Sequence, residues 1–253
     1  MRFTHLVFLL NFLIIVSCKD EPYRLTKVKG TLIEINDSIA PNTEIESFIA
    51  PYKNHIEKDL DSTIAFAMDS YSKSDGELNT ALGNFMADVL YEQANPVFNS
   101  RTGKHIDMVL LNHGGIRSII PKGPVRIRNM FELMPFENKI VVVALKGKQI
   151  DSMISYLSQA RRAHPISKLK LKLDENYNPV SATINGETIN QDKTYYVATS
   201  DYLYNNGDNM RFFRPNDSLY DLNYKIRNAL IDYLKKTDTI NPVIDDRFIQ
   251  IKN

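Results

Sequence analysis

Apolar residues recur at three- and four-residue spacing in two long stretches of the chain, and this spacing predicts two amphipathic helices. The first stretch covers residues 45–60, with Pro51 near its first turns. The second runs over residues 82–94. Pro96 is expected to stop that helix, because proline lacks the amide hydrogen that continues the backbone ladder. Two further helices are expected, over residues 150–157 and 222–235.

Short continuous runs of apolar and β-branched residues predict buried strands. Five such runs cover residues 64–68, 108–111, 140–145, 195–199 and 248–251. Between residues 169 and 197, apolar and polar positions alternate, and Asn185-Gly186 indicates a hairpin. Strands are thus mixed with helices and no internal repeat is seen, which favours one α/β domain.

The segment before this domain has a different character. Residues 18–40 are polar and mixed, and we expect a tether with one strand around Thr31–Ile35. The predicted organisation is therefore a targeting segment over 1–17, a tether over 18–40 and a domain over 41–253.

The start of the chain has the pattern of a targeting segment. Arg2 is positive, and residues 6–16 are apolar apart from Asn11, a run too short to span a bilayer comfortably. The run ends in Ser17 and Cys18, the only cysteine of the chain. This ending resembles the lipobox of bacterial lipoproteins, in which the cysteine becomes the acylated first residue. A plain signal peptide with an incidental cysteine is the alternative.

Lipidation of Cys18 implies a protein anchored in the membrane of the cell envelope, outside the cytoplasm. The charged run Lys19-Asp20-Glu21 resembles signals that send some lipoproteins outward, so the outer membrane or cell surface is expected. With its one cysteine acylated, the chain forms no disulfide and no thiolate metal site.

Charge and composition narrow the class of function. The chain is 43% hydrophobic and 24% charged, which suits a globular protein with one substantial core. Lys and Arg number 31 and Asp and Glu 30, so there is no broad basic surface for a nucleic-acid polymer. Recognition of phosphate must come from a few placed groups.

The first candidate for chemistry is the loop after the predicted strand at 108–111, which contains Asn112, Gly114, Gly115 and Arg117. Glycines let the backbone approach a ligand, and Arg117 is able to fork onto a phosphate or ribose oxygen. An ordinary turn is the alternative, and the spacing alone does not decide between them.

Two further loops each carry an aromatic residue. Phe136 lies just before a predicted strand, and Tyr202 precedes Gly207 and Asp208. Two aromatics from separate loops are able to sandwich a base, a contact worth about 1 to 3 kcal/mol per base. Asp208 is then placed to accept hydrogen bonds from ribose hydroxyls. The alternative role, commoner for a loop aromatic, is a lid over the core.

Taken in order, these loops resemble the C-terminal domain of the 5′-nucleotidase family. The motifs that carry the resemblance are Leu82-Gly83-Asn84, Asn112 to Arg117, Pro135 to Asn138 and Tyr202 to Asn209. The resemblance covers about residues 41–251. It implies an α/β (α+β) fold, a four-layer α/β/β/α sandwich with mixed sheets.

The resemblance also assigns roles residue by residue. Phe136 and Tyr202 would clamp the nucleobase, and Asn112 would bond its edge. Asp208 would hold the ribose, and Arg117 would face ribose or phosphate. The full set of substrate-binding candidates is Asn112, Gly114, Gly115, Arg117, Phe136, Tyr202, Gly207 and Asp208.

Several positions depart from the family pattern. His113 stands where glycine is usual, and Asn206 and Asn209 replace two glycines of the last loop. Asparagine tolerates positive φ, so that loop is expected to keep its shape. The stretch 76–81 lacks the basic residue that the family has there, so an arginine that helps to hold phosphate is missing.

In full-length 5′-nucleotidases, two metal ions held by a separate N-terminal domain hydrolyse the phosphate ester. Here the histidines after the targeting segment stand singly, at His55, His105, His113 and His164. We therefore expect no catalytic residue, metal site or cofactor in this chain. Divalent metals are expected only on a separately encoded metallophosphoesterase subunit.

Three hypotheses for function follow. The leading one is the nucleotide- or nucleoside-binding half of a 5′-nucleotidase-type phosphomonoester hydrolase, inactive without that partner subunit. The alternative is a surface lipoprotein that binds nucleotides or nucleosides without hydrolysis, which the missing arginine favours. A degenerate scaffold is the third, and the intact binding set argues against it.

Overall fold

The computed structural model describes residues 24–251, which divide into two units with their boundary between Ile49 and Ala50. The lipidation site predicted at Cys18 lies outside the described residues. Among residues 24–251, no helix combines the length and apolar character needed to cross a membrane.

The first unit contains an extended segment and the beginning of α2 (Thr43–Leu60). Residues 24–35 form neither helix nor strand, so the strand expected around Thr31–Ile35 is absent. A strand is stabilised by hydrogen bonds to a neighbour, and no described strand pairs with this segment. Helix α2 matches the predicted stripe, but Pro51 lies in its middle rather than in its first turns.

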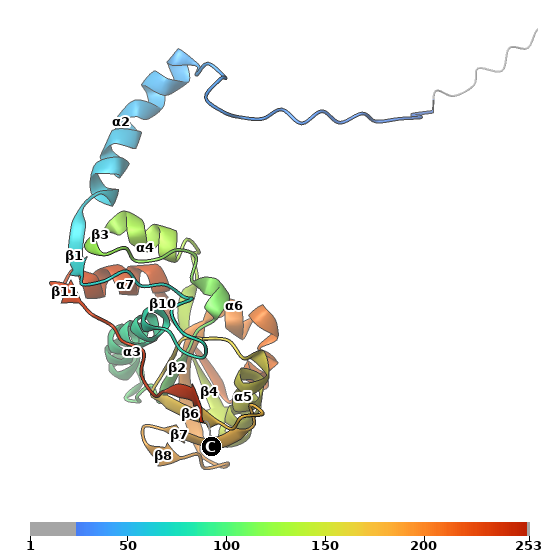
Figure 1. The fold of residues 1–253 in the computed structure, drawn as a ribbon, viewed down its shortest axis with the longest axis vertical. Coiled ribbons are helices and arrows are strands. Elements are labelled where there is room, and N and C mark those ends of the chain that lie inside the picture. The colour runs from blue at the N-terminus through green and yellow to red at the C-terminus, as the bar shows by residue number, and fades with distance from the viewer. Residues whose placement is uncertain (1–23, 252–253) are drawn as a thin grey trace, which may run out of the picture. The chain divides into compact units, whose positions relative to one another are not determined.

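The second unit is built on a five-stranded mixed sheet with the strand order β10-β4-β9-β2-β5. Three of its strands, β2, β4 and β10, are labelled in Figure 1. Its strands are β2 (Met108–Leu110), β4 (Lys139–Lys146), β5 (Ile166–Ser167), β9 (Thr194–Ser200) and β10 (Ser218–Lys225). Strand β2 is parallel to β9, whereas β4 is antiparallel to both β9 and β10.

Side chains of the central strands alternate between two cores. Ile140 and Val142 of β4 pack in the core that contains α3, whereas Val141 and Val143 pack in the core that contains α5. Because both faces of the sheet are covered, the central strands appear in the sequence as continuous apolar runs.

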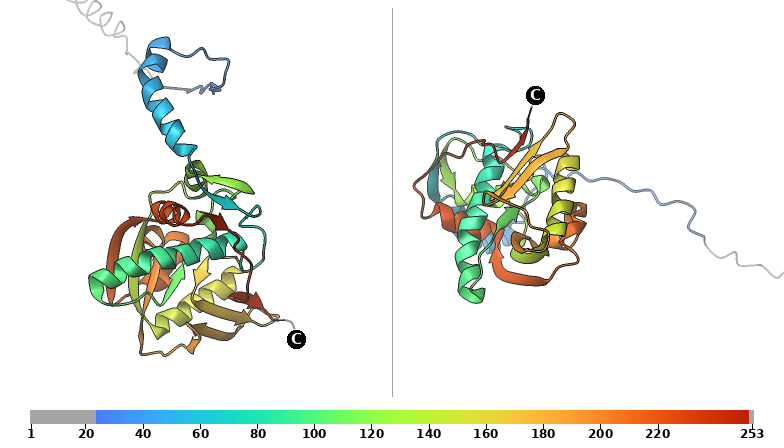
Figure 2. Two further views of the ribbon diagram at one scale, coloured as in Figure 1. Left: turned by 90° about the vertical axis from the view of Figure 1, so that its left-hand side faces the viewer. Right: turned by 90° about the horizontal axis from the view of Figure 1, so that it is seen from below.

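Helices α3 (Ala81–Thr102) and α7 (Ile226–Leu234) supply the first core, and α5 (Gly147–Ala160) supplies part of the second. In the right-hand view of Figure 2, α3 in blue-green and α5 in yellow stand on opposite sides of the strands. A four-stranded sheet completes the second core, with β6 (Leu169–Leu173), β7 (Pro179–Ile184), β8 (Glu187–Thr188) and β12 (Phe248–Gln250).

A third sheet joins β1 (Thr63–Ala67), β3 (Gly123–Arg126) and β11 (Thr239–Ile240), and α4 (Ile127–Leu133) follows β3 directly. All three sheets contain both parallel and antiparallel pairs. The mixed α/β architecture expected from the sequence is therefore confirmed.

Two predicted helix ends were wrong. Pro96 lies inside α3, which continues to Thr102 and ends at Gly103 with a left-handed φ of 70°. The continuation buries Phe98 completely, against the rings of Tyr196 and Tyr220, and this packing outweighs the hydrogen bond that proline loses. Helix α7 begins at Ile226 because the residues before it form the edge strand β10.

Candidate functional site

Three loops meet at one end of the strands of the central sheet. The carboxyl ends of parallel strands β2 and β9 lie at this end of the sheet, and the amino end of antiparallel β4 lies beside them. The loop after β2 includes the 3₁₀ turn η1 (His113–Gly115), and β9 leads into α6 (Asp201–Tyr204) and η2 (Gly207–Asn209). The region outside the carboxyl ends of parallel strands is a common position for ligand sites in α/β folds.

A cleft of about 290 Å³ lies at this end of the sheet. It is lined by Asn112, Gly114, Gly115, Arg117, Phe136, Asn138, Tyr202 and Asp208. Seven of the eight residues proposed from sequence thus come together, and the eighth, Gly207, lies behind Tyr202. Asn138 belongs to the same motif as Phe136 but was not among the predicted binding residues.

Three donors hold Asp208 in place. Its two carboxylate oxygens accept hydrogen bonds from Asn112 Nδ2 at 2.8 Å and from the Tyr202 hydroxyl at 3.0 Å. Its backbone carbonyl accepts a hydrogen bond from the Tyr156 hydroxyl at 2.9 Å. The hydrogen bond to Asp208 raises the pKa of Tyr202, so this hydroxyl stays protonated and donating. Asn112 therefore orients the acid in this structure.

Glycines of the site make room for neighbouring protein side chains. A Cβ on Gly115 would lie 2.8 Å from Asn112 Oδ1, and one on Gly207 would lie 2.4 Å from Tyr202 Cε1. Both distances are shorter than a van der Waals contact allows. The sequence suggested that glycine here serves the approach of a ligand, whereas these two glycines serve the placement of Asn112 and Tyr202.

The loop that carries Asp208 has an unusual backbone. Asn206, Asp208 and Asn209 have φ values of 69°, 50° and 60°, in the left-handed region. Asn and Asp enter this region more readily than other side chains. The expectation that Asn206 and Asn209 tolerate positive φ in place of glycine is confirmed.

The two aromatic rings of the cleft are partly open to solvent. Phe136 is 42% exposed and Tyr202 46% exposed, so neither is a buried lid over the core. The Arg117 guanidinium lies 5.9 Å from the Phe136 ring centroid and donates to the Gly114 carbonyl at 3.4 Å. Within residues 24–251, no carboxylate forms an ion pair with Arg117. Its charge is therefore available at the cleft.

The loop that carries Phe136 is held by a buried arginine of α7. Arg227 donates to the carbonyls of Met134 and Phe136, at 3.1 and 3.3 Å, and pairs with Glu137. Hydrogen bonds from Lys225 and Arg227 lower the pKa of Glu137 to about 2. Arg227 was missed from sequence, because no local pattern links it to a loop about 90 residues earlier in the chain.

A buried histidine supports the loop after β2. The backbone N–H of His113 donates to His164 Nδ1 at 3.3 Å, and the His113 ring faces the Ala163 carbonyl rather than the cleft. His164 is only 4% exposed, and its burial lowers the pKa to about 4. The acceptor nitrogen is thus unprotonated at neutral pH. No pattern in the sequence indicated this support.

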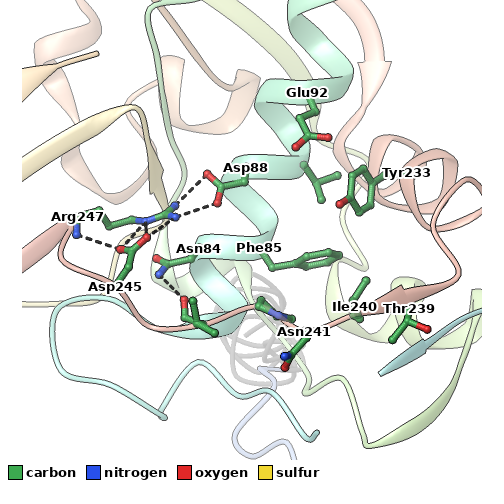
Figure 3. Close-up of a pocket in the computed structure, with 13 residues that line it drawn as sticks. Asn84, Phe85, Asp88, Glu92, Tyr233, Thr239, Ile240, Asn241, Asp245 and Arg247 are labelled. Carbon is green, nitrogen blue, oxygen red and sulfur yellow. Dashed lines mark hydrogen bonds and ion pairs between the residues drawn. The ribbon is translucent and has the colours of Figure 1, made fainter. Parts of the chain in front are cut away.

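A second cavity, of about 310 Å³, lies beside α3 (Figure 3). Its charged wall is an ion-pair network in which Arg247 donates to both Asp88 and Asp245, and also to the Ile166 carbonyl. Every nitrogen of this guanidinium is engaged within the protein. The network joins α3 to the segment just before β12, and Arg247 keeps no open position for an anionic ligand.

In the part of the chain that the structure describes, no three His, Cys, Asp or Glu side chains gather in a way that would hold a metal ion. Of the histidines singled out from sequence, His113 and His164 lie together.

The sequence model for the family described as "5′-nucleotidase, C-terminal domain" matches residues 57–215. Among curated proteins, the trifunctional nucleotide phosphoesterase protein YfkN of Bacillus subtilis is 26% identical over 239 residues, 87% of this chain. The 5′-nucleotidase of Bos taurus is 22% identical over 252 residues, 90% of this chain. Among solved structures, a 5′-nucleotidase precursor of Thermus thermophilus superposes with a TM-score of 0.68 at 23% identity, covering 84% of this chain. That likeness shows the fold.

The chain spans only part of each relative. It covers 16% of the Bacillus protein and 44% of both the bovine and the Thermus proteins. Because the bovine match takes in 90% of this chain, it necessarily includes the residues between about 27 and about 226. It therefore reaches well before residue 57, where the match to the family model begins.

Proposed function

This chain belongs to the family of 5′-nucleotidase C-terminal domains, and from that premise we propose that its cleft binds a nucleoside or nucleotide as the substrate-binding half of a phosphomonoester hydrolase. The observation that carries the proposal is the composition of the cleft. Two partly exposed rings stand in one cleft with a carboxylate that two side chains orient.

Each part of a nucleotide has a chemically suitable partner in this cleft. The base stacks between Phe136 and Tyr202, because every base presents a π-face to an aromatic ring. The ribose hydroxyls donate to Asp208, whose oxygens keep lone pairs beyond those that Asn112 and Tyr202 use. Arg117, which has no ion-pair partner in the described chain, faces ribose or phosphate oxygens.

The proposal assigns hydrolysis to a separately encoded metallophosphoesterase subunit that docks on this chain. Two-metal hydrolysis needs several carboxylate and imidazole ligands close together, and the proposed partner carries them. The chain spans 44% or less of the relatives described above, which supports a division of binding and hydrolysis between this chain and a second subunit. The proposed location is the cell envelope, outside the cytoplasm, with a lipid anchor at Cys18.

A second candidate function is capture of nucleosides or nucleotides without hydrolysis. The stretch 76–81, where the family has a basic residue, packs into this protein instead. Leu78 is buried, and the buried Asn79 donates to the carbonyls of Asp245 and Phe248. No cation from this stretch reaches a phosphate, which favours a ligand held mainly by its nucleoside part.

Phosphate release separates the two candidates. Adenosine and AMP binding to the purified protein is measured by calorimetry, and phosphate release from AMP with Mn²⁺ or Zn²⁺ is measured for this protein, for the metallophosphoesterase of the same genome, and for their mixture. The split enzyme predicts release that rises on mixing and falls when Phe136→Ala replaces the wild type. Binding with no rise on mixing supports capture alone. Turnover by this protein alone, after contaminating phosphatases are removed, contradicts both.

A further inference from the structure

Six large aliphatic side chains are exposed in the extended segment before α2. They are Leu25, Val28, Leu32, Ile33, Ile35 and Ile39, with exposed fractions from 49% to 98%. Single exposed apolar residues are ordinary on a protein surface, but a run of them marks a surface that another molecule covers.

Within this run, Thr31–Ile35 has the chemistry of a strand without a partner. In an extended chain, Thr31, Ile33 and Ile35 share one face, and all three are β-branched. Within residues 24–251, no backbone hydrogen bond reaches any residue from 31 to 35. Unpaired backbone groups beside β-branched side chains form a template for pairing with the edge of a sheet.

The span matched to the bovine relative extends over this segment. That match necessarily includes residues 31–35, although the family domain begins to match only at residue 57. The segment therefore lies within the stretch matched to a longer relative, before the residues that match the family domain.

We propose that Thr31–Ile35 becomes a strand only when it adds to an exposed sheet edge of the metallophosphoesterase subunit. The inference rests on the split enzyme proposed above. Backbone hydrogen bonds to that edge give affinity, and a pocket for Ile33 and Ile35 gives specificity. A lipid bilayer is a poorer occupant, because its interior offers no partner for the unpaired backbone groups.

Hydrogen exchange and a matched pair of variants test the strand. Ile33 and Val28 are both aliphatic, β-branched and exposed to nearly the same degree, 78% and 77%. The purified protein and the purified metallophosphoesterase of the same genome are mixed. The amides of residues 31–35 then exchange more slowly than in the protein alone. Ile33→Asp weakens the complex by about tenfold or more, whereas Val28→Asp changes it by less than about twofold.

Other outcomes overturn the proposal in distinguishable ways. If a complex forms but residues 31–35 stay unprotected and Ile33→Asp binds like wild type, the strand is wrong and the split enzyme stands. If no complex forms and mixing does not raise phosphate release, both are wrong. Slower exchange of the same amides in this protein alone at high concentration, or on phosphatidylglycerol vesicles, assigns the segment to a second copy or to a membrane instead. Adenosine binding stays at the wild-type value in both variants, because the cleft lies in the second unit.

Discussion

Phe136 and Tyr202 show how the exposure of a single side chain separates a binding role from a structural one. Each ring is somewhat under half exposed and therefore has limited core contact to lose. Phe136→Ala or Tyr202→Ala should lower adenosine affinity by about 5- to 150-fold, equivalent to about 1 to 3 kcal/mol of stacking. The midpoint of thermal unfolding should change little. Calorimetry and thermal unfolding of the same preparations measure both quantities.

Tyr204 supplies the control for this prediction. It lies in the same short helix as Tyr202, but it packs against the second core and its hydroxyl donates to Asn216. Tyr204→Ala should therefore lower stability and leave adenosine affinity unchanged. A loss of about 3 to 5 kcal/mol of folding stability in Phe136→Ala or Tyr202→Ala would show that the rings belong to the core. Unchanged adenosine binding in both would remove the sandwich.

Residues of the cleft could be named from sequence because each stands in a short local motif. Asn112, Phe136 and Asp208 all follow or precede predicted strands, and their loops meet because those strands are neighbours in one sheet. The residues that support them could not be named. Arg227 and His164 look ordinary in sequence, and their roles arise only from contacts made on folding.

For single helices and strands, tertiary packing outweighed the local sequence pattern in two ways: one helix continued past its predicted end, and one predicted strand did not form. Pro96 predicts a helix end, yet α3 continues because Phe98 fills the core beyond it. Thr31–Ile35 predicts a strand, yet no described strand pairs with it. The Asn185-Gly186 hairpin between β7 and β8 was predicted correctly, because both residues take the positive φ that such a turn requires.

His164 connects the segment after α5 with the loop after β2, and this connection should depend on pH. Burial lowers the pKa of His164 from 6.5 to about 4. The charge of His113 lowers this pKa further, whereas the negative charge of Asp208 raises it. Between pH 4 and pH 6.5, His164 is protonated in the unfolded chain but neutral in the folded protein. Stability is therefore fully present above pH 6.5 and lost as pH falls toward 4, by an amount on the order of 3 kcal/mol.

The variant His164→Asn isolates this effect. Asparagine presents an oxygen near the position of Nδ1, so it keeps an acceptor for the His113 N–H but does not titrate. Denaturant unfolding of both proteins from about pH 7 to about pH 4.5 should show a steeper loss for wild type. Parallel curves would contradict the assignment, because carboxylates common to both proteins would then account for all the pH dependence.

For the whole molecule, the order of helices and strands was enough to predict a mixed α/β fold, because the continuous apolar runs of β2, β4 and β9 require cover on both faces. The small third sheet could not be predicted. Its strands β3 and β11 have four and two residues, too few to show a periodicity, and they gain stability only by pairing with β1.

Attachment of the whole molecule to a membrane is predicted from the sequence alone. Cys18 ends an apolar run directly after Ser17, and it is the only cysteine of the chain. Several acyl chains on this residue would bind the membrane durably, because each buried methylene contributes about 0.8 kcal/mol. Metabolic labelling with a fatty-acid analogue should tag the wild type in the membrane fraction and leave Cys18→Ser untagged. Because no other thiol is present, a tag on Cys18→Ser would place any acylation on another kind of residue and rule out the predicted anchor.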